Sequence, residues 1–594
     1  MALIDKASLL MVPSTYEAGK LYNVLPSGNR APDNKGGAGY DQTRADFDFD
    51  RGSNAAASRI NSSGLIEKYR ENVLLQSNNF GTTWLTANTS LTSGQSGYDG
   101  TNNAWLLEVT ATGSYRRVYQ SGINLDVNTF SIYAKANTSN FLFLLNNKSS
   151  TDAVAWFDLS NGSIGGVNAA IDTKIESVGN GWYRCSVTSI FADNQYFVSV
   201  ADGSADINGT IGTSLYIQSA QLESGLAATD VLTSGATTAK AGVLIDLPRI
   251  NFDANGENGA LLLEPSRQQL LQYSEYFGGW TLSNSTITSN ATTSPEGVNN
   301  ASLYTSTNVT NYVRNIITAS NATYTLSVFV KRVSTDEFRM NFSDGVTGEI
   351  RYVFNLADET STLTKSGGTI SGYSADFENY GNGWYRLHIT ATTNAGTAIT
   401  AYFETDNETG SFYAYGAQLE AGSYATSYIP TYGVSQTRAQ DNCFGAGDGS
   451  TFNDSEGVLF IEAATLSELD ITARYFQLSD GTITANGITF RYYTTTNYFQ
   501  ALYYTGGAYQ AVLSVFLSDS SQFNKIAYKY KANDFALWVN GVKIGTDTSG
   551  NTGAVLSNLN FNNNGYDGFE GKTKQLLYFN EALSDSELAT LTTL

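Results

Sequence analysis

The residues of this sequence that could act on a ligand are aromatic rings that stand near amide and carboxylate side chains. Sugars present apolar C–H faces and rings of hydroxyl groups, so a sugar site needs an aromatic platform with polar partners around it. The candidate platform residues are Trp84, Trp105, Tyr115, Trp156, Trp280, Tyr304 and Tyr312. The competing interpretation, that each ring fills a protein core, stays open for all seven because Trp and Tyr are highly buried on average.

The chain contains one domain twice, as described below, and two of these seven rings occur in the first copy only. The second half has Ser302 near the position of Trp105, and Val353 near the position of Trp156. A shared core role would favour retention of the ring in both halves. The differences therefore point to exposure or specialisation at Trp105 and Trp156.

Catalytic constellations are not evident. The single histidine, His388, is expected on an exposed strand face, so we expect no Ser-His-Asp arrangement and no histidine-based metal site. A glycosidase needs only two carboxylates, and the 55 Asp and Glu residues cannot exclude such a pair. These acids are scattered over short strands and loops. We expect no enzyme and keep a glycan depolymerase as the less favoured alternative.

Two equivalent loops carry oxygen ligands of the hard type that calcium prefers. They are 99–104, which begins with Asp99, and 296–301, which begins with Glu296; each continues with Gly and then two Asn residues. Calcium is therefore a candidate cofactor. A plain Asn-rich turn is the competing interpretation.

A six-residue motif shows that the chain contains a duplicated domain. Gly-Asn-Gly-Trp-Tyr-Arg occurs at 179–184 and again at 381–386. The Gly and Asn residues predict a tight turn, and the residues after it predict a strand. Other landmarks repeat at a similar spacing, for example Phe80 and Phe277 (277 − 80 = 197). We place the copies at 71–226 and 270–424, each with about eight strands, which is the size of a two-sheet jelly roll.

The duplication also assigns roles to the cysteine and the histidine of the repeats. Cys185 stands where the second copy has Leu387, so we interpret it as a small apolar core residue; nothing supports a disulfide with Cys443. His388 corresponds to Ser186 on the opposite strand face. We therefore predict that His388 is exposed and is neither a ligand nor a base.

The composition indicates an all-β protein of roughly three to five domains. Tyr, Phe, Gly, Ser, Thr and Asn are abundant over the 594 residues, and the formal net charge is −21. An acidic protein is repelled by nucleic acid and by anionic membranes, so neither is an expected partner. No secretory signal and no run long enough to insert into a membrane is found.

The segments outside the repeats differ from them. Residues 1–70 contain short apolar pieces without a core of their own, which predicts an N-terminal attachment segment; a leader strand on the next domain is the open alternative. Linkers are expected at 227–269 and 425–455. Residues 456–594 read as a third sandwich, with a hairpin turn at Asn540-Gly541 and a short C-terminal helix.

Several landmarks together resemble a known family. Each copy opens on an apolar run (74–80 and 270–277), contains the Gly-Asn-Gly-Trp-Tyr-Arg turn and closes on Gln-Leu-Glu-x-Gly (221–225 and 418–422). This pattern resembles the carbohydrate-binding-module-like jelly rolls of tailed-phage virion proteins. The Val-Asn-Gly of 539–541 with the Ala-Leu-Ser-x-x-Glu-Leu of 582–588 resembles the laminin-G/concanavalin-like sandwich.

The resemblance implies tandem β-sandwich (jelly-roll) domains in a structural component of a virion. It implies an exposed tail fibre or appendage that binds host surface glycans, with other virion proteins as partners and a homo-oligomeric state. A head or tail decoration protein that binds other virion proteins is the alternative.

Overall fold

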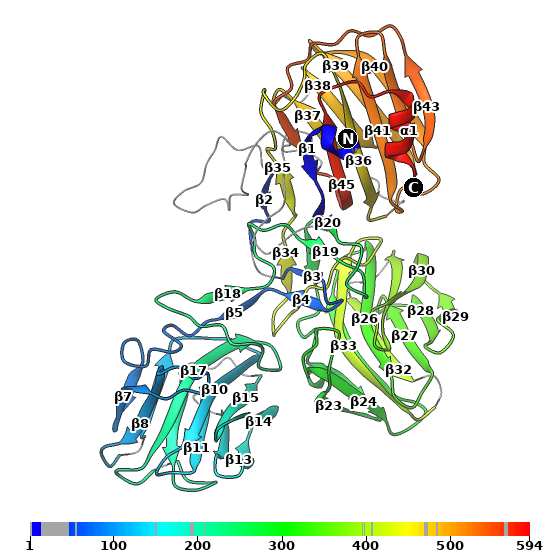
Figure 1. Ribbon diagram of the computed structural model, residues 1–594. Helices are drawn as coiled ribbons and strands as arrows, with labels where there is room; N and C mark the ends of the chain where they lie inside the picture. Colours follow the sequence, from blue (N-terminus) through cyan, green and yellow to red (C-terminus); the bar gives the residue numbers. More distant parts are fainter. Residues whose placement is uncertain are drawn as a thin grey trace. The chain divides into compact units, whose positions relative to one another are not determined.

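The computed structural model describes residues 3–13, 47–53, 56–113, 115–148, 151–190, 195–207, 209–394, 396, 398–405, 408–467, 473–482, 485–562 and 568–594 (Figure 1). The chain divides into two compact units. The first unit comprises Met1–Glu67, Val243–Arg267 and Thr437–Leu594, and the second comprises Lys68–Gly242 and Gln268–Gln436. The described residues are almost entirely strands and turns, which confirms the all-β prediction.

The first repeat folds as a sandwich of two antiparallel sheets. In spatial order, its sheet I contains β14 (Asp172–Gly179), β15 (Trp182–Ser189), β10 (Asn128–Ala136), β17 (Ser214–Ser224), β8 (Ala104–Val109) and β7 (Thr89–Gln95). Its sheet II contains β13 (Ser163–Asn168), β12 (Thr151–Asp158), β11 (Phe141–Lys148), β16 (Gln195–Ala201), β9 (Arg117–Ser121) and β6 (Leu85–Ala87).

The second repeat has the same architecture. Its sheet I contains β23 (Ser285–Thr292), β24 (Ala301–Ser306), β33 (Ser411–Ala421), β26 (Thr323–Arg332), β31 (Trp384–Thr393) and β30 (Ile370–Asn379). Its sheet II contains β22 (Thr281–Ser283), β25 (Tyr312–Thr318), β32 (Ala398–Thr405), β27 (Glu337–Ser343), β28 (Glu349–Asn355) and β29 (Thr360–Gly367). A short 3-10 helix, η3 (Phe277–Gly279), precedes β22.

Each repeat has more strands than the sequence predicts. The described residues form two 6-stranded sheets per repeat, against about eight strands predicted. The additional strands include short edge strands such as β6, and strands such as β29 that are exposed along their whole length. Without a buried face, such strands show no alternation of apolar and polar residues.

The repeated motif forms the β14–β15 turn in the first repeat and the β30–β31 turn in the second. Asn180 and Gly181 have φ of 52° and 76°, and Asn382 and Gly383 have φ of 51° and 78°. Two successive residues with positive φ form a type I′ turn, which matches the twist of the flanking strands. The predicted turn and strand are both confirmed.

The first unit contains the C-terminal sandwich. One sheet contains, in spatial order, β19 (Ile250–Asn251), β20 (Ala260–Leu263), β45 (Gly571–Phe579), β36 (Glu456–Thr465), β41 (Asn524–Lys531), β42 (Phe535–Val539) and β43 (Val542–Asp547), with β1 (Ala7–Met11) also paired to β45. The facing sheet contains β40 (Ala508–Phe516), β39 (Tyr498–Thr505), β38 (Gly487–Tyr492), β37 (Arg474–Ser479) and β44 (Asn558–Asn560).

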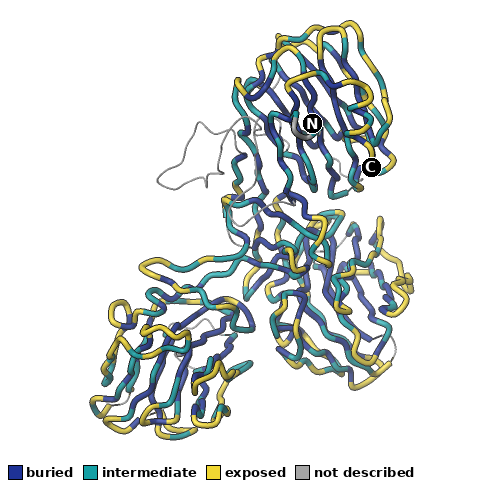
Figure 2. Tube along the Cα trace, viewed as in Figure 1, coloured by how far each residue is buried: buried dark blue, intermediate teal, exposed yellow. Residues whose placement is uncertain are grey.

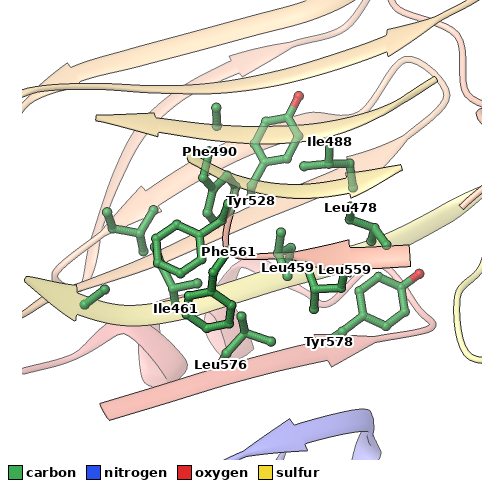
Figure 3. Packing of buried hydrophobic residues seen from close by; sticks show 14 of the residues in the cluster. Leu459, Ile461, Leu478, Ile488, Phe490, Tyr528, Leu559, Phe561, Leu576 and Tyr578 are labelled. Carbon is green, nitrogen blue, oxygen red and sulfur yellow. The ribbon is translucent and has the colours of Figure 1, made fainter. Parts of the chain in front are cut away.

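The core of this sandwich lies between its two sheets. Leu459 and Ile461 of β36 belong to the same buried cluster as Ile488 and Phe490 of β38 (Figure 3). Figure 2 shows buried residues running along the strands and exposed residues at the turns. The chain ends in α1 (Asp585–Thr592), whose N-cap Ser584 and residue Glu587 form the predicted capping box.

The N-terminal segment belongs to the C-terminal sandwich. Ala7, Leu9 and Met11 of β1 are fully buried, and β1 pairs with β45. β2 (Asp48–Asp50) pairs with β35 (Asn442–Phe444). The sequence predicts an attachment segment over 1–70, or a leader strand on the next domain; instead its apolar strand completes a sheet whose other strands come from residues far along the chain. Residues 14–46 of that segment lie outside the described residues.

Several small elements complete the fold. They are the 3-10 helix η1 (Leu3–Lys6), the hairpin of β3 (Ser58–Ile60) with β4 (Ile66–Lys68), the pair of β5 (Arg70–Asn72) with β18 (Ala239–Ala241), and the pair of β21 (Arg267–Gln269) with β34 (Gln436–Arg438). No helix among the described residues is long and apolar enough to cross a membrane.

A buried charge cluster joins the three chain segments of the first unit. Arg51 contacts Asp441 at 3.2 Å, and Arg249 contacts Glu264 at 2.7 Å. Arg249 also pairs with Asp441, and Arg438 pairs with Glu264 at 2.9 Å. Buried ion pairs add little net stability because desolvation opposes the attraction, but removing one partner is costly. The cluster therefore links the three segments through ion pairs, and the loss of any one partner would leave a buried charge without compensation.

Candidate functional site

The outer face of sheet I in the first repeat is covered by a strap, which we define as residues 226–232. The carboxylate of Glu223 accepts hydrogen bonds from the backbone N–H and the hydroxyl of Thr229, at 2.9 and 2.5 Å. The amide oxygen of Gln221 accepts from the N–H of Leu232 at 2.7 Å. Burial raises the pKa of Glu223, although the hydrogen bonds from Thr229 oppose the rise. Gln-Leu-Glu is therefore a clasp that holds the returning chain.

The second repeat has the same clasp and strap, here residues 425–431. Glu420 accepts from the backbone N–H and hydroxyl of Thr426 at 2.9 and 2.6 Å, and Gln418 accepts from the N–H of Ile429 at 2.7 Å. Arg386 of the turn motif donates to the carbonyl of Thr426 at 2.7 Å. The strap takes up the polar groups of this sheet face, so the face is not available to a ligand.

The motif tryptophans also belong to this covered face. Trp182 and Trp384 are each 2% exposed, on strands whose opposite face carries Cys185 and Leu387 in the sandwich cores. Val231 of the strap packs against the cluster that contains Trp182. These two tryptophans are therefore structural, and they pack on the outer side of sheet I.

The outer face of sheet II in the first repeat carries a second hydrophobic cluster. Its buried members are Phe143, Leu145, Val154, Phe197 and Ala201. The half-buried ring of Trp156 lies on Phe143 with centroids 4.7 Å apart, and its N–H donates to the carbonyl of Asp206 at 2.8 Å. An apolar layer on the outside of a sandwich is not required by the core, so it marks a candidate binding face.

Arg117 lies among the rings of this face. Its guanidinium carbon is 3.7 Å from the centroid of Phe197, 4.2 Å from that of Tyr115 and 4.7 Å from that of Tyr119. Its Nε and Nη1 atoms have no hydrogen-bond partner among the described residues. Burial lowers the pKa of Arg117, but a guanidinium is not deprotonated in proteins, so the side chain remains a cation. Tyr115 is 48% exposed and gives the group an accessible aromatic edge.

The corresponding face of the second repeat also combines arginine and tyrosine. Arg314 is 5.1 Å from the ring centroid of Tyr312 and 5.7 Å from that of Tyr402, and it donates to the Tyr402 hydroxyl at 3.2 Å. The hydrogen bond to Tyr402 raises the pKa of Arg314. All three side chains are half-buried. Arg314 makes no ion pair with a carboxylate in the part of the chain that the structure describes.

A polar network extends from these tyrosines across the same face. Arg339 pairs with Glu404 at 3.0 Å, and the amide of Asn341 donates to Glu404 at 2.6 Å. Arg351 donates to Asn341 at 3.0 Å and pairs with Glu349 at 2.9 Å. Burial raises the pKa of Glu404, although Arg339 and Arg351 oppose the rise. Arg339, Asn341 and Glu404 are buried beneath this face, where their pairing supports it, and the half-buried side chains of Tyr312, Arg314, Arg351 and Tyr402 are its accessible groups.

Strand register shows how the two faces diverged. Phe143 pairs with Ser199 across β11 and β16, and Arg339 pairs with Glu404 across the equivalent strands β27 and β32. Trp156 corresponds to Val353 at the offset of 197 (353 − 156 = 197). The first face is mainly aromatic and aliphatic, and the second is mainly charged, which is the kind of difference expected where duplicated sites acquire separate ligands.

We define the first outer face as Tyr115, Arg117, Tyr119, Trp156 and Phe197. The second outer face is Tyr312, Arg314, Arg339, Tyr402 and Glu404.

Three of the seven rings predicted as sugar platforms lie in the cores. Trp84 and Trp280 are each 5% exposed and Tyr304 is fully buried, so none has the free face that a platform needs. Trp105 is half-buried at the core rim, where its N–H donates to the carbonyl of Asn78 at 3.1 Å. Tyr115, Trp156 and Tyr312 lie on the outer faces.

Sequence reasoning missed Arg117, Arg314 and Tyr402. The Tyr-x-Arg spacing at 115–117 and 312–314 was an available signal, because alternate residues of a strand share one face. The role of Tyr402 could not be found that way, since it depends on the pairing of β25 with β32.

The two predicted calcium loops are engaged differently. Asp99 accepts from the hydroxyl of Thr101 at 2.7 Å and from the amide of Gln218 at 3.0 Å. Glu296 instead pairs with Lys68 at 2.9 Å. No group of three or more His, Cys, Asp or Glu side chains that could hold a metal occurs among the described residues. The calcium assignment stays a prediction.

Lys68 is the centre of a buried network in the second unit. Its ammonium is 2.8 Å from Glu275 as well as 2.9 Å from Glu296, and it donates to the hydroxyl of Tyr432 at 2.8 Å. Tyr415 donates to Glu296 at 2.8 Å. Burial lowers the pKa of Lys68, but the two carboxylates outweigh it and raise the pKa above its usual range. The lysine supplies the positive charge that the carboxylate of Glu296 requires.

His388 lies on the predicted strand face but is not exposed. It is half-buried, and its Nε2 has no hydrogen-bond partner among the described residues. Burial lowers its pKa, while Glu378 opposes this shift. The prediction of exposure is wrong; β31 lies between β26 and β30, with His388 opposite Ser327 and Asp376.

A cavity of about 390 Å³ lies at one end of sheet II in the first repeat. Its lining consists of aliphatic and uncharged polar side chains: Val73, Leu75, Thr83, Leu85, Gln120, Ser121, Ile123 and Thr238. It lacks the aromatic and charged groups of the outer faces.

Comparisons with known proteins give similarity of fold only. No protein-family model matches the sequence, and no curated protein matches it. The CBM40 of the Ruminococcus gnavus IT-sialidase, solved with alpha2,3 sialyllactose, covers 25% of this chain and 93% of its own at 18% identity and a TM-score of 0.22.

Two further solved structures are similar in the same limited sense. The CBM22-1-CBM22-2 tandem domain of Paenibacillus barcinonensis Xyn10C covers 63% of this chain and 100% of its own at 11% identity and a TM-score of 0.19. Domains LG4-5 of the mouse laminin alpha1 chain cover 46% of this chain and 88% of their own at 8% identity and a TM-score of 0.18. At these TM-scores the functional argument rests on the residues of this chain.

Proposed function

We propose that this protein binds glycans through the outer faces of sheet II in its two repeats. The observation that carries the proposal is the second outer face, where two tyrosine rings flank Arg314 and continue into a network of guanidinium, amide and carboxylate groups. Aromatic rings pack against the C–H faces of sugars, and planar polar groups donate to and accept from their hydroxyls.

The first outer face supports the same function with different chemistry. Its rings are more numerous, and Tyr115 and Trp156 remain accessible. Arg117 retains unused donor capacity at Nε and Nη1. Both atoms are buried, so a sugar carboxylate would be attracted by the positive charge of the guanidinium and not by a direct hydrogen bond to them.

We place this activity in a structural, non-enzymatic protein of a tailed-phage particle. The support is the resemblance of the repeats and their closing motif to modules of such proteins, with an exposed appendage as the expected position. The alternatives are a decoration protein that binds other virion proteins, and a depolymerase.

A glycan array probed with the full-length protein tests the binding activity. We expect a subset of glycans to be retained, and we expect Tyr312→Ala to weaken retention by the second outer face about tenfold, equivalent to about 1.4 kcal/mol. Tyr373→Ala is the matched control, because Tyr373 is 37% exposed on β30 in the other sheet of the same repeat. Equal loss in both variants, or no glycan bound by the wild type, would contradict the proposal.

The proposed place of the protein in a phage particle is tested separately. Microscopy of labelled particles distinguishes an appendage from a decoration protein, since an appendage projects from the particle and a decoration protein lies on its shell. Incubation with host capsule distinguishes a depolymerase, which would release reducing ends.

A further inference from the structure

The edge strand β40 of the C-terminal sandwich is exposed and apolar. It pairs only with β39 among the described strands, and it ends the five-stranded sheet (Figure 1). Val512 is 46% exposed and Phe516 is 68% exposed. The ring of Phe516 lies against the half-buried ring of Tyr498, with centroids 4.9 Å apart.

The register of β40 with β39 shifts at Gln510, which places a bulge at the start of the strand, but the segment from Ala511 to Phe516 lacks the features that keep edge strands apart. No charged residue and no proline occurs from 505 to 518, although the protein has 89 charged side chains (34 + 55). Edge strands of monomeric proteins usually carry a charge, a proline or a bulge that blocks pairing with another chain. The edge strand of the facing sheet, β43, carries Lys543 and Asp547. The β40 edge is therefore built to pair.

We propose that β40 pairs with β40 of a second copy of this chain, antiparallel about a two-fold axis at Ser514. This register sets Val512 opposite Phe516 and Leu513 opposite Val515, each twice. The first pair joins the most exposed apolar residues of 511–517, and aromatic–β-branched pairs are among the favourable cross-strand pairs.

The register also preserves the inside and outside of both sheets. Ala511, Leu513 and Val515 face the sandwich core, whereas Val512, Ser514 and Phe516 face outward. Residues directly opposite in an antiparallel pair lie on the same face. If the two-fold axis passes through a residue, core-facing residues of one strand lie opposite core-facing residues of the other; an axis between two residues would place them opposite outward-facing residues. With the axis at Ser514, the two five-stranded sheets would form one continuous ten-stranded sheet.

Centring the axis on Ser514 avoids the covered end of the strand. A Cβ placed on Gly550 would stand 2.6 Å from the carbonyl oxygen of Gln510, so the loop at Gly550 already lies against the start of β40. Residues 511–517 lie beyond that loop.

A second copy is the occupant that this surface fits. A two-fold axis makes a single uncharged strand self-complementary, without a separate partner surface. The chain has a net charge of −21, so two copies repel one another over most surfaces. The neutral segment 505–518 is a place where they can approach at low electrostatic cost.

The proposal is tested by the mass of the full-length protein, measured by light scattering as the protein elutes from a size-exclusion column. We expect the wild type to have the mass of a dimer, or of two copies of a larger assembly. The mass should fall to half in Phe516→Lys, because the variant would bury two ammonium groups in the interface. Phe516 is largely exposed, so the monomer should fold normally, which its melting curve checks. Val542→Lys, at a 60% exposed residue of β43, is the matched control and should keep the wild-type mass. A wild-type monomer at every concentration, or an unchanged mass in Phe516→Lys, overturns the proposal.

A cysteine at the axis tests the register. Ser514→Cys changes one atom and sets two thiols opposite one another, and both native cysteines, Cys185 and Cys443, are buried. Mild oxidation should give a covalent dimer on a non-reducing gel. Ser366→Cys, at an exposed serine of the edge strand β29, should not. Equal cross-linking in the two variants would overturn the Ser514 axis. None of these results depends on glycan binding.

Discussion

On the outer faces of sheet II in both repeats, an arginine lies among aromatic rings. Arg117 and Arg314 have rings within 3.7 to 5.7 Å, and neither makes an ion pair in the described chain. The ring stacking holds each guanidinium in place, which reduces the entropy that a ligand must remove.

The acid response of stability depends on His388. Burial lowers its pKa, so the folded state favours neutral imidazole. The stability that this provides is present above the unfolded pKa of about 6.5 and is lost as pH falls. We expect the melting temperature to fall between pH 7.5 and pH 5.5, and His388→Ser, which installs the residue of the first repeat, to flatten that fall.

His388 is the only histidine of the chain, so a difference in pH dependence between the wild type and His388→Ser can be assigned to this side chain. Its charged neighbours are Glu378, Arg386, Asp376 and Glu420. Parallel pH curves for the wild type and His388→Ser would show that the imidazole is not the titrating group.

Lys68 offers a second test at the residue scale. Its pKa is raised, so it contributes stability below the unfolded pKa of about 10.4 and loses that contribution as pH rises further. Lys68→Met leaves Glu275 and Glu296 buried without their cation, which should cost about 3–5 kcal/mol. Urea unfolding followed by tryptophan fluorescence measures this cost.

The control is Lys174→Met, because Lys174 and Glu176 form a surface pair with side chains 47% and 49% exposed. Such pairs contribute at most about 1 kcal/mol. If both variants lost the same stability, the buried network would not be the reason.

At the scale of elements, the clasp and strap decide which sheet face is free. Glu223 and Glu420 hold equivalent threonines, and Gln221 and Gln418 hold equivalent backbone N–H groups. The strap occupies sheet I, so sheet II is the face that we propose for ligand binding. The motifs most visible in the sequence are thus structural, and the residues that we propose to bind glycans lie where the repeats differ.

The clasp can be broken by one substitution. Glu420→Gln turns an amide N–H₂ toward the donors of Thr426 and leaves a buried donor without an acceptor, which costs about 1–3 kcal/mol. We expect a lower midpoint of urea unfolding for the second repeat. Glu176→Gln, at an exposed carboxylate of β14, should leave the midpoint unchanged. If Glu420→Gln also left it unchanged, the hydrogen bonds between Glu420 and Thr426 would not stabilise the second repeat.

Many of these turns, strands and domains were predictable from the sequence. The Gly-Asn-Gly turn, the duplicated sandwiches and the capping box at Ser584 all follow from local patterns. Strands such as β29, exposed throughout, were not predictable because they have no buried face to impose alternation. Tyr312 was selected as a candidate from its residue type and lies on an outer face, whereas Trp280 was selected in the same way and lies in the core, which only packing reveals.

At the scale of the whole molecule, segments far apart in the sequence form one unit. β1, β19 and β20 add to the sheet of the C-terminal sandwich, and the buried arginines Arg51, Arg249 and Arg438 hold the same three segments together. The sequence predicts consecutive domains because local patterns carry no information on such distant pairing. Repeats with glycan-binding faces, joined to a sandwich with a dimerising edge, would bind through several weak sites, and the resulting avidity exceeds the affinity of any one site.

The most direct test is an equilibrium titration of the full-length protein with a glycan retained on the array, compared with the double variant Tyr312→Ala/Tyr402→Ala. Glycan binding by the second outer face predicts saturable binding for the wild type and a loss of affinity of tenfold or more, about 1.4 kcal/mol, in the variant, with an unchanged melting temperature. Wild-type affinity in a correctly folded double variant, with Tyr115→Ala equally without effect, would contradict the proposed function.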